Sequence, residues 1–187
     1  NDSIPLTDAI VTTSKNPLYA TQILSALDLN PHPAKSAQDL LRLVPGLFIS
    51  QHQGGGKAEQ IFLRGFDCDH GTDINITVDD MPVNLVAHAH GQGYADLHFL
   101  IPELISDFEW GKGPYYTSKG DFTTAGFVNY NTKDFLDRNF VKLEGGRFTT
   151  ERIAAAVNLL DDNAKAKGQS LYIAGEGIYS NGGPFTQ

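Results

Sequence analysis

Histidine and acidic side chains are concentrated in one stretch of the sequence, and these residue types can ligate metals or carry protons. Four of the six histidines lie between residues 70 and 98, at His70, His88, His90 and His98. Side chains alternate along an extended chain, so His88 and His90 would project to the same side. Imidazole nitrogens beside carboxylates suit Zn, Cu, Ni or Fe. The spacing favours either a metal site formed by His70, His88 and His90 or polar rings that hydrogen-bond inside the fold.

A glycine-rich segment lies upstream, at residues 51–57. Backbone N–H groups of such loops can bind phosphate. The phosphate-loop pattern needs a glycine where Gln51 stands, and a serine or threonine where Ala58 follows Lys57. The sequence therefore does not predict a nucleotide-binding loop here.

Sequence signatures of common catalytic sites are missing. The sequence contains neither Gly-x-Ser-x-Gly nor His-Glu-x-x-His, and Cys68, the only cysteine, has no identifiable base partner. A His-x-His pair with nearby carboxylates also occurs in cupin-type metalloenzymes, so a metal-binding enzyme is the alternative interpretation. We predict a protein that is not an enzyme and has no certain resident cofactor.

Charge and cysteine content exclude further classes. The formal net charge is -8 and the pI about 5.1, so the basic stripe that would bind phosphate backbones is missing. We therefore predict no nucleic-acid partner. A single cysteine excludes an internal disulfide framework and a zinc site of paired thiolates. No stretch approaches the roughly 18 apolar residues of a membrane-spanning helix.

Short elements must position these side chains. Ser36 and the apolar spacing after it predict a short amphipathic helix that ends at Pro45 and Gly46. Short strands are predicted at residues 47–50, 60–64, 75–78, 108–110 and 126–131, between clusters of Gly, Asp and Asn. Pro102 and Glu103 favour a single helical turn at residues 101–105. Together these elements predict a small mixed sheet with short helices.

The pattern changes after Lys133. In residues 152–159, apolar side chains occupy one face of the predicted strand, and small or polar side chains, Arg152 among them, occupy the other. Residues 141–144 repeat this alternation, and residues 169–180 repeat it more weakly. Such alternation is typical of outer-membrane barrel strands and also of half-buried strands in a soluble sandwich.

The order of short motifs from residue 36 to residue 133 is more specific than any single motif. The motifs are SAQDLL (36–41), VPGL (44–47), IFLRGF (61–66), ITVDDMPV (76–83), IPE (101–103), KGP (112–114) and GFVNY (126–130). In this order they resemble the plug of TonB-dependent outer-membrane receptors. Asp80 stands where that family usually has glycine.

The resemblance implies a fold class and a domain organisation. It implies an α+β plug domain, with a small mixed sheet and short helices, followed by the first antiparallel strands of a 22-stranded transmembrane β-barrel. Residues 1–35 would form a periplasmic N-terminal segment, residues 36–133 the plug, and residues 134–187 the start of the barrel. An open strand edge cannot exist in lipid, so we expect this chain to be a fragment of the functional molecule.

The resemblance also assigns roles to residues. The TonB box, a segment that pairs as an added strand with TonB, would be Asp8, Ala9, Ile10, Val11 and Thr12. The alternative is that this run is the first strand of the plug. Two apical loops would contact the solute through Gln51, His52, Gln53, His88, His90, Gln92 and Tyr94. Arg64, Gly65, Lys112, Gly113 and Pro114 would be structural, with Arg64 as a buried arginine.

The implied function is that of a receptor in the bacterial outer membrane with a periplasmic N-terminus. It would bind a scarce solute, such as a metal chelate or siderophore, at the cell surface and import it with energy transmitted by TonB. Expected partners are TonB with its inner-membrane energising complex, the solute, outer-membrane lipid and, as a further candidate, a surface lipoprotein. A transported metal ion or chelate would be cargo. The alternative to transport is a surface-binding barrel, and the sequence does not identify the solute.

Overall fold

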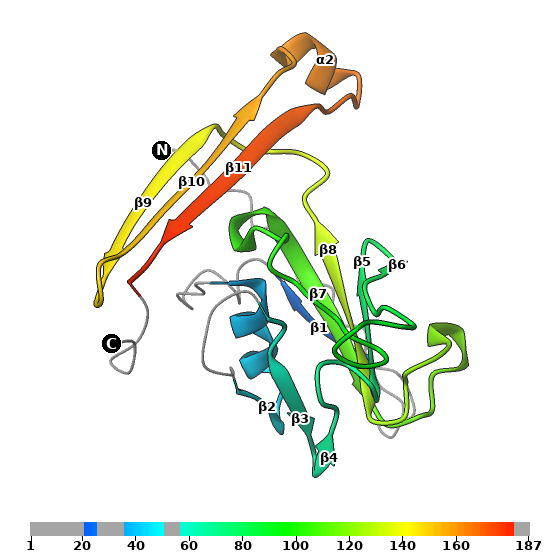
Figure 1. Cartoon of the computed structure of the whole chain (residues 1–187). Coiled ribbons are helices and arrows are strands. Elements are labelled where there is room, and N and C mark those ends of the chain that lie inside the picture. The colour runs from blue at the N-terminus through cyan, green and yellow to red at the C-terminus, as the bar shows by residue number, and fades with distance from the viewer. Residues whose placement is uncertain (1–20, 26–35, 51–56, 182–187) are drawn as a thin grey trace.

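A mixed five-stranded sheet forms the centre of the protein (Figure 1). The computed structural model describes residues 21–25, 36–50 and 57–181. The strand order is β1-β7-β8-β5-β6. The strands are β1 (Gln22–Ser25), β5 (Ile74–Val78), β6 (Met81–Pro82), β7 (Ile105–Lys112) and β8 (Gly126–Thr132). β5 and β8 pair in parallel and the other pairs are antiparallel, so the predicted mixed sheet is confirmed.

The N-terminal part of the chain contributes more to this sheet than the sequence indicated. Residues 22–25 were expected in the segment that precedes the plug. They form β1 instead, which pairs antiparallel with β7 from Gln22 opposite Trp110 to Ser25 opposite Asp107. β1 is therefore an edge strand of the central sheet.

A second, smaller sheet and a short helix cover one side of the central sheet. The strands β2 (Leu47–Ser50), β3 (Gln60–Leu63) and β4 (Phe66–Asp67) are antiparallel neighbours in this order. The predicted helix is present as the 3-10 helix η1 (Ala37–Leu43), capped where Ser36 Oγ accepts from the Asp39 N–H at 3.4 Å. Helices this short close in the tighter 3-10 form more readily than long ones.

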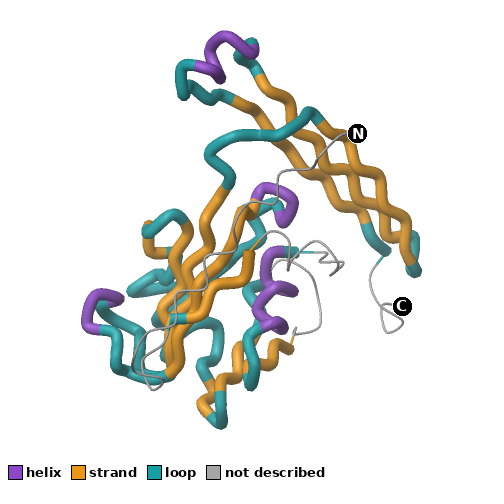
Figure 2. The backbone as a smooth tube through the Cα atoms, turned by 180° about the vertical axis from the view of Figure 1, so that it is seen from behind, coloured by secondary structure: helices purple, strands orange, loops and turns teal. Residues whose placement is uncertain are grey.

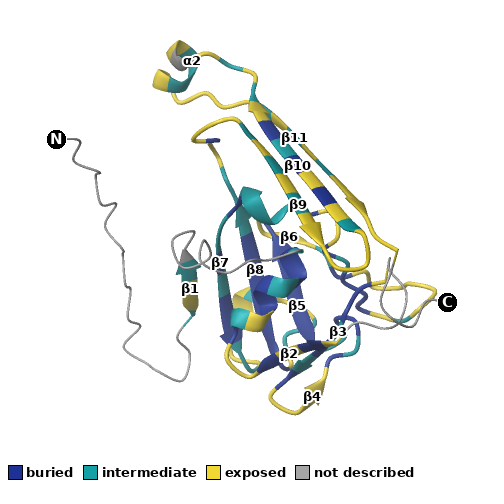
Figure 3. Cartoon of the chain, turned by 90° about the vertical axis from the view of Figure 1, so that its left-hand side faces the viewer, coloured by how far each residue is buried: buried dark blue, intermediate teal, exposed yellow. Residues whose placement is uncertain are grey.

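The core lies between η1, the small sheet and one face of the central sheet. Figure 3 shows the buried residues concentrated in β5, β7 and β8. Phe108 and Tyr130 lie opposite each other in the sheet with ring centroids 5.5 Å apart. The Tyr130 hydroxyl donates to the Ala37 carbonyl at 3.2 Å, which links η1 to β8. Each fully buried apolar side chain of this size contributes about 2 kcal/mol, so this face holds the two sheets together.

Three long antiparallel strands follow the central sheet (Figures 1 and 2). They are β9 (Phe140–Gly146), β10 (Thr150–Asn158) and β11 (Tyr172–Tyr179), in the order β11-β10-β9. Their outer face exposes apolar side chains, whereas Ala154, Ala156 and Arg152 on the other face of β10 are buried. The predicted two-faced alternation is confirmed. The exposed apolar side chains include Val141, Leu143, Ile153 and Ile173.

Short helices complete the described part of the chain. The predicted turn before β7 is the 3-10 helix η2 (Pro102–Leu104), and η3 (Thr117–Lys119) lies between β7 and β8. The helix α2 (Asp162–Ala166) was not predicted; the Asp161 side chain caps it by accepting from the Ala164 N–H at 2.9 Å. None of the helices in residues 21–25, 36–50 and 57–181 is long and apolar enough to cross a membrane.

Candidate functional site

Ala58 positions the first candidate site, a group of aromatic and imidazole rings. Its N–H donates to the Tyr94 hydroxyl at 2.6 Å, and its carbonyl oxygen lies 2.8 Å from His70 Nδ1. Both rings are buried. The Leu85 N–H donates to the Tyr94 carbonyl at 2.8 Å and closes residues 85–94 into a loop. The backbone before β3 and this loop thus fix His70 and Tyr94.

Two exposed histidines rest on these fixed rings. His88 stacks on Tyr94, with ring centroids 4.2 Å apart and an interplanar angle of 12°. His90 meets His70 edge-on at 4.4 Å, and its backbone N–H donates to His88 Nδ1 at 3.1 Å. Desolvation and the imidazole of His70 lower the pKa of His90, so its neutral form is favoured. We call His70, His88, His90 and Tyr94 the ring cluster.

Two glycines hold the loop of the ring cluster against the segment that follows His70. A Cβ added to Gly71 would lie 2.5 Å from the Gly93 carbonyl oxygen, and one added to Gly93 would lie 2.8 Å from the Gly71 carbonyl oxygen. Both residues have positive φ, 123° and 72°. The Asn84 side-chain amide donates to both of these carbonyls, at 2.8 and 3.1 Å. A side chain at either glycine would push the loop away.

The ring cluster does not form a metal site as it stands. Among the residues that the structure describes, no group of three or more His, Cys, Asp or Glu side chains is arranged to hold a metal ion. Two ring nitrogens already have partners, because His70 Nδ1 contacts the Ala58 carbonyl and His88 Nδ1 accepts from His90. The assignment of His70, His88 and His90 to a metal stays a prediction. What the arrangement offers is an aromatic surface edged with imidazole nitrogens.

The other predicted solute contacts are only partly placed. Gln92 is exposed on the same loop as the ring cluster. Gln51, His52 and Gln53 lie outside the described residues, and so does the predicted TonB box at residues 8–12.

The predicted structural residues lie at two turns beside the core. Arg64 is exposed in this chain, and its burial and structural role in the complete receptor stay a prediction. It occupies the turn between β3 and β4 with Gly65, at φ values of 52° and 88°. Desolvation and the positive charge of Arg64 lower the pKa of Lys112, which ends β7. Gly113 donates to the Ala125 carbonyl at 2.7 Å, and Pro114 is exposed after it.

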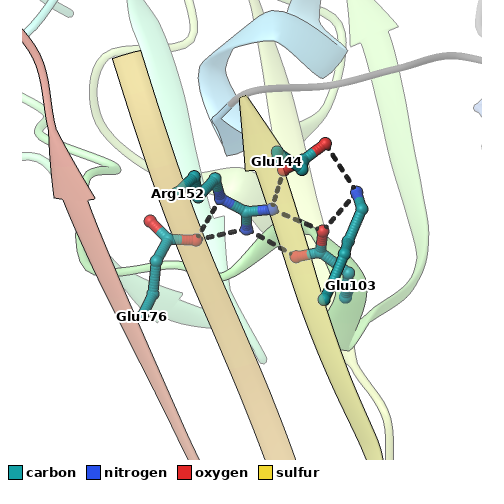
Figure 4. Close-up of polar contacts among 5 residues, drawn as sticks. Glu103, Glu144, Arg152 and Glu176 are labelled. Atoms are coloured by element: carbon teal, nitrogen blue, oxygen red, sulfur yellow. Dashed lines mark hydrogen bonds and ion pairs between the residues drawn. The ribbon is translucent and has the colours of Figure 1, made fainter. Parts of the chain in front are cut away.

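A second candidate site was missed by the sequence analysis. The buried guanidinium of Arg152 on β10 binds Glu103 of η2 through two hydrogen bonds of 2.7 Å (Figure 4). It also binds Glu144 of β9 at 2.6 Å and Glu176 of β11 through its Nε at 3.0 Å. Lys142 of β9 binds the same Glu103 at 2.8 Å. We call these five residues the ion cluster.

The ion cluster joins the central fold to the three long strands. Burial alone would raise the pKa of Glu103, but hydrogen bonds from Arg152 and Lys142 outweigh it and bring the pKa to about 2. Glu103 is therefore ionised at neutral pH.

The sequence contains one local signal for the ion cluster. Arg152 lies on a strand face that carries alanine at Ala154 and Ala156. Its partner Glu103 lies 49 residues earlier in the chain, and no local sequence pattern indicates that Arg152 and Glu103 are in contact.

The amino-acid sequence matches a known protein family over more than half of the chain. Residues 13–127 match the family described as the TonB-dependent receptor plug domain. The chain belongs to this family. The match contains the ring cluster and Glu103, whereas Lys142, Glu144, Arg152 and Glu176 lie beyond it. The ion cluster thus connects the matched plug region to the strands that follow.

Solved structures of receptors share this fold. The ferric enterobactin receptor PfeA of Pseudomonas aeruginosa is 20% identical with a TM-score of 0.53, over 77% of this chain and 22% of that one. The ferric yersiniabactin uptake receptor FyuA of Yersinia pestis is 20% identical with a TM-score of 0.55, and the match covers 76% of this chain and 22% of that one. FpvA of P. aeruginosa, solved with bound pyoverdines, is 18% identical with a TM-score of 0.58, and the match covers 78% of this chain and 18% of that one.

These comparisons confirm the predicted fold class, a mixed α+β plug with few helices followed by antiparallel strands. The chain spans about a fifth of the length of these receptors.

Proposed function

We propose that this chain is the plug and first barrel strands of an outer-membrane receptor that imports a scarce solute with energy from TonB. The observation that carries the proposal is the family match over residues 13–127. Three solved relatives are described as ferric enterobactin, ferric yersiniabactin and pyoverdine-binding receptors, which supports a siderophore-like solute. The family is one of receptors, and we propose no catalytic activity.

The three long strands support a position in the outer membrane. Apolar side chains lie on their outer face, with Val141 68% and Leu143 74% exposed, whereas the small and charged side chains of β10 face the plug. Transmembrane barrel strands alternate in this way between lipid and lumen. In this proposal the chain before β1 leads from the periplasm, the plug runs from β1 to residue 133, and residues 134–187 begin the barrel.

The plug acts as a gate in this mechanism. A solute bound outside must favour a plug conformation that exposes the TonB box, otherwise binding could not be signalled across the plug. β1 follows that segment and, among the described residues, lies at the edge of the sheet and pairs only with β7. A pull on the N-terminus therefore reaches the central sheet first at this edge. TonB with its energising complex would supply the pull, and a surface lipoprotein is a further candidate partner.

The ring cluster is our candidate for solute contact on the plug. Stacked His88 and Tyr94 offer a flat face to an aromatic group, and the neutral imidazole of His90 offers a lone pair. A metal chelate with aromatic groups fits this chemistry. Gln92 and the predicted contacts Gln51, His52 and Gln53 would add amide and imidazole hydrogen bonds.

Ile10→Pro tests the coupling to TonB. Proline removes a backbone donor that an added strand needs, so uptake by cells carrying the complete receptor is expected to fall about tenfold or more. Surface binding of the solute should stay unchanged. The measurement compares binding and accumulation of radiolabelled ferric siderophores by the same cells, with a strain lacking TonB as reference. Uptake at the wild-type rate would place the TonB box elsewhere.

His88→Ala/His90→Ala tests the ring cluster. Each replaced contact should weaken binding by about 1 kcal/mol, so a drop in affinity of about 30-fold is expected for the pair. Calorimetric titration of the complete receptor with Zn(II), Cu(II) and an iron chelate at two pH values is the measurement. Wild-type affinity should weaken as the pH falls through the imidazole range, and the double variant should lose this dependence. Equal affinities and pH profiles would remove these histidines from the solute site. His98→Ala, on an exposed histidine outside the ring cluster, is the matched control.

A further inference from the structure

Glu59 is a buried carboxyl group that the proposed function does not use. It directly precedes β3 and is only 7% exposed. Its Oε2 accepts no hydrogen bond, and the side chain forms no ion pair, within the part of the chain that the structure describes. An ionised carboxylate would be costly in this position, because burial removes its water and nothing donates to it instead.

Charged and titratable groups from three parts of the fold lie near this carboxyl group. They are Asp39 and Arg42 of η1, His98, and Tyr130 of β8. The two cations have other partners. Arg42 Nε lies 3.5 Å from Asp39, and His98 Nδ1 lies 2.5 Å from Asp96. Burial and the negative charge of Asp39 raise the pKa of Glu59, and the two cations offset this only in part.

Gln38 of η1 carries a second buried oxygen without a donor. The residue is 2% exposed, and its Oε1 accepts no hydrogen bond from any described residue. Gln38 precedes Asp39, whose charge acts on Glu59, so both acceptors lie in the same region of the core. A proton on Glu59 would remove the buried charge and supply a donor here. Unlike a metal ion, a proton needs no cavity.

Ala58 connects this carboxyl group to the ring cluster. Its N–H donates to the Tyr94 hydroxyl at 2.6 Å, and its carbonyl oxygen lies 2.8 Å from His70 Nδ1. An ionised Glu59 would be driven from the core toward water or a cation. Because Ala58 is only one peptide bond away, such a movement would pull it from both rings.

We propose that Glu59 is a positioning residue for the ring cluster and that it acts in its protonated form. The proton keeps Glu59 in the core and thereby keeps Ala58 against Tyr94 and His70. Release of this proton to solvent displaces the segment before β3 and loosens both rings. The inference rests on the proposed function only for the role of the ring cluster, and its test uses no solute, so the two can fail separately.

Hydrogen exchange of the Ala58 amide in the complete receptor measures this coupling. The pKa of Glu59 is raised above 4.5 in the folded protein, so the closed state binds the proton more tightly than the locally open state. The stabilisation is fully present below pH 4.5 and is lost as the pH rises through the folded pKa. Protection of the amide, corrected for intrinsic exchange, should fall about tenfold per pH unit over this window, since each opening releases one proton.

Glu59→Gln keeps the size of the side chain and a hydrogen-bond donor but cannot ionise. Protection of the Ala58 amide in this variant should therefore not fall with rising pH. His90 acts in the opposite direction because its pKa is lowered, and it is present in both proteins, so their difference isolates Glu59. Glu151→Gln removes an exposed carboxyl group on β10 and is the matched control, for which the wild-type profile is expected.

Infrared difference spectra detect the proton directly through the C=O stretch of a protonated carboxylic acid. As the pH rises above 4.5, this band should persist in the difference between the wild type and Glu59→Gln. It should already be lost in the difference between the wild type and Glu151→Gln. The proposal is overturned if both differences lose the band together, or if the wild type and Glu59→Gln give the same pH profile at the Ala58 amide.

Discussion

Arg152→Met is expected to free η2 from the three long strands and to lower the free energy of its local unfolding by about 3 kcal/mol. Methionine keeps the apolar stem of the arginine but removes the guanidinium. Glu103, Glu144 and Glu176 would then lie close together without their shared cation, and Lys142 alone cannot neutralise all three. Removing one partner of a buried ion pair is costly because it leaves the other charges unpaired.

Hydrogen exchange of the Lys133 amide measures this effect. The amide donates to the Leu104 carbonyl at 2.8 Å, so it reports whether η2 stays in place. In the complete receptor its exchange should accelerate roughly 100-fold in Arg152→Met. Arg147→Met, an exposed arginine in the β9–β10 hairpin, is the matched control and should leave the rate unchanged. An unchanged rate in Arg152→Met would show that the ion cluster does not hold η2.

The pH dependence of the same amide provides a second check on the ion cluster. The pKa of Glu103 falls from 4.5 to about 2 in the folded protein, so the unfolded state binds the proton more readily. The stabilisation is fully present above about pH 4.5, including neutral pH, and is lost as the pH falls toward 2. Protection of the Lys133 amide, corrected for intrinsic exchange, should therefore fall below pH 4.5. Glu103→Gln should reduce this dependence and leave the part that comes from Glu144, whose pKa is lowered by hydrogen bonds from Arg152 and Lys142.

Gly71→Ala is the second change with a large expected effect, a loss of about 3 kcal/mol at the loop of the ring cluster. The new methyl group would lie 2.5 Å from the Gly93 carbonyl oxygen and 3.0 Å from the Ala95 Cβ. Backbone atoms cannot rotate away as a flexible side chain can. The φ of 123° is also unfavourable for alanine. The loop should therefore shift away from His70.

The amide of Ala95 reports this displacement, because it donates to the His70 carbonyl at 2.8 Å. Its hydrogen exchange should accelerate roughly 100-fold in Gly71→Ala. Gly65→Ala is the matched control: φ there is also positive, at 88°, but nothing lies within 4 Å of the added Cβ. Backbone strain alone should cost about 1 kcal/mol and leave Ala95 protected. Similar exchange at Ala95 in both variants would show that the contact with Gly93 is unimportant.

The sequence by itself determined the local elements of this protein. Ser36 predicted a helix start, Pro102 predicted the turn before β7, and the alternation around Ile153 predicted a strand with one apolar face. These features depend on helix capping, on the fixed φ of proline and on the alternation of successive side chains between the two faces of a strand. Each of these effects acts over only a few residues. The family was recognisable for a related reason, because its short motifs follow in the same order.

The residues of the ring cluster were predicted from sequence, but their geometry was not. His88 and His90 were singled out by spacing as metal ligands. The tertiary structure instead stacks His88 on Tyr94 and gives both Tyr94 and His70 a hydrogen-bond partner at Ala58. Which nitrogen faces solvent depends on those long-range hydrogen bonds, which no local pattern encodes.

Tertiary structure alone decided the ion cluster, the exposure of Arg64 and the place of β1 in the central sheet. Arg152 meets Glu103 only because β10 lies against η2, and β1 joins the sheet only because β7 offers a free edge. Sequence separations of 49 residues and more lie beyond the range of capping and periodicity. Such contacts form when apolar faces dock and bring distant charges together, and the cost of burying those charges then selects the pairs that satisfy each other.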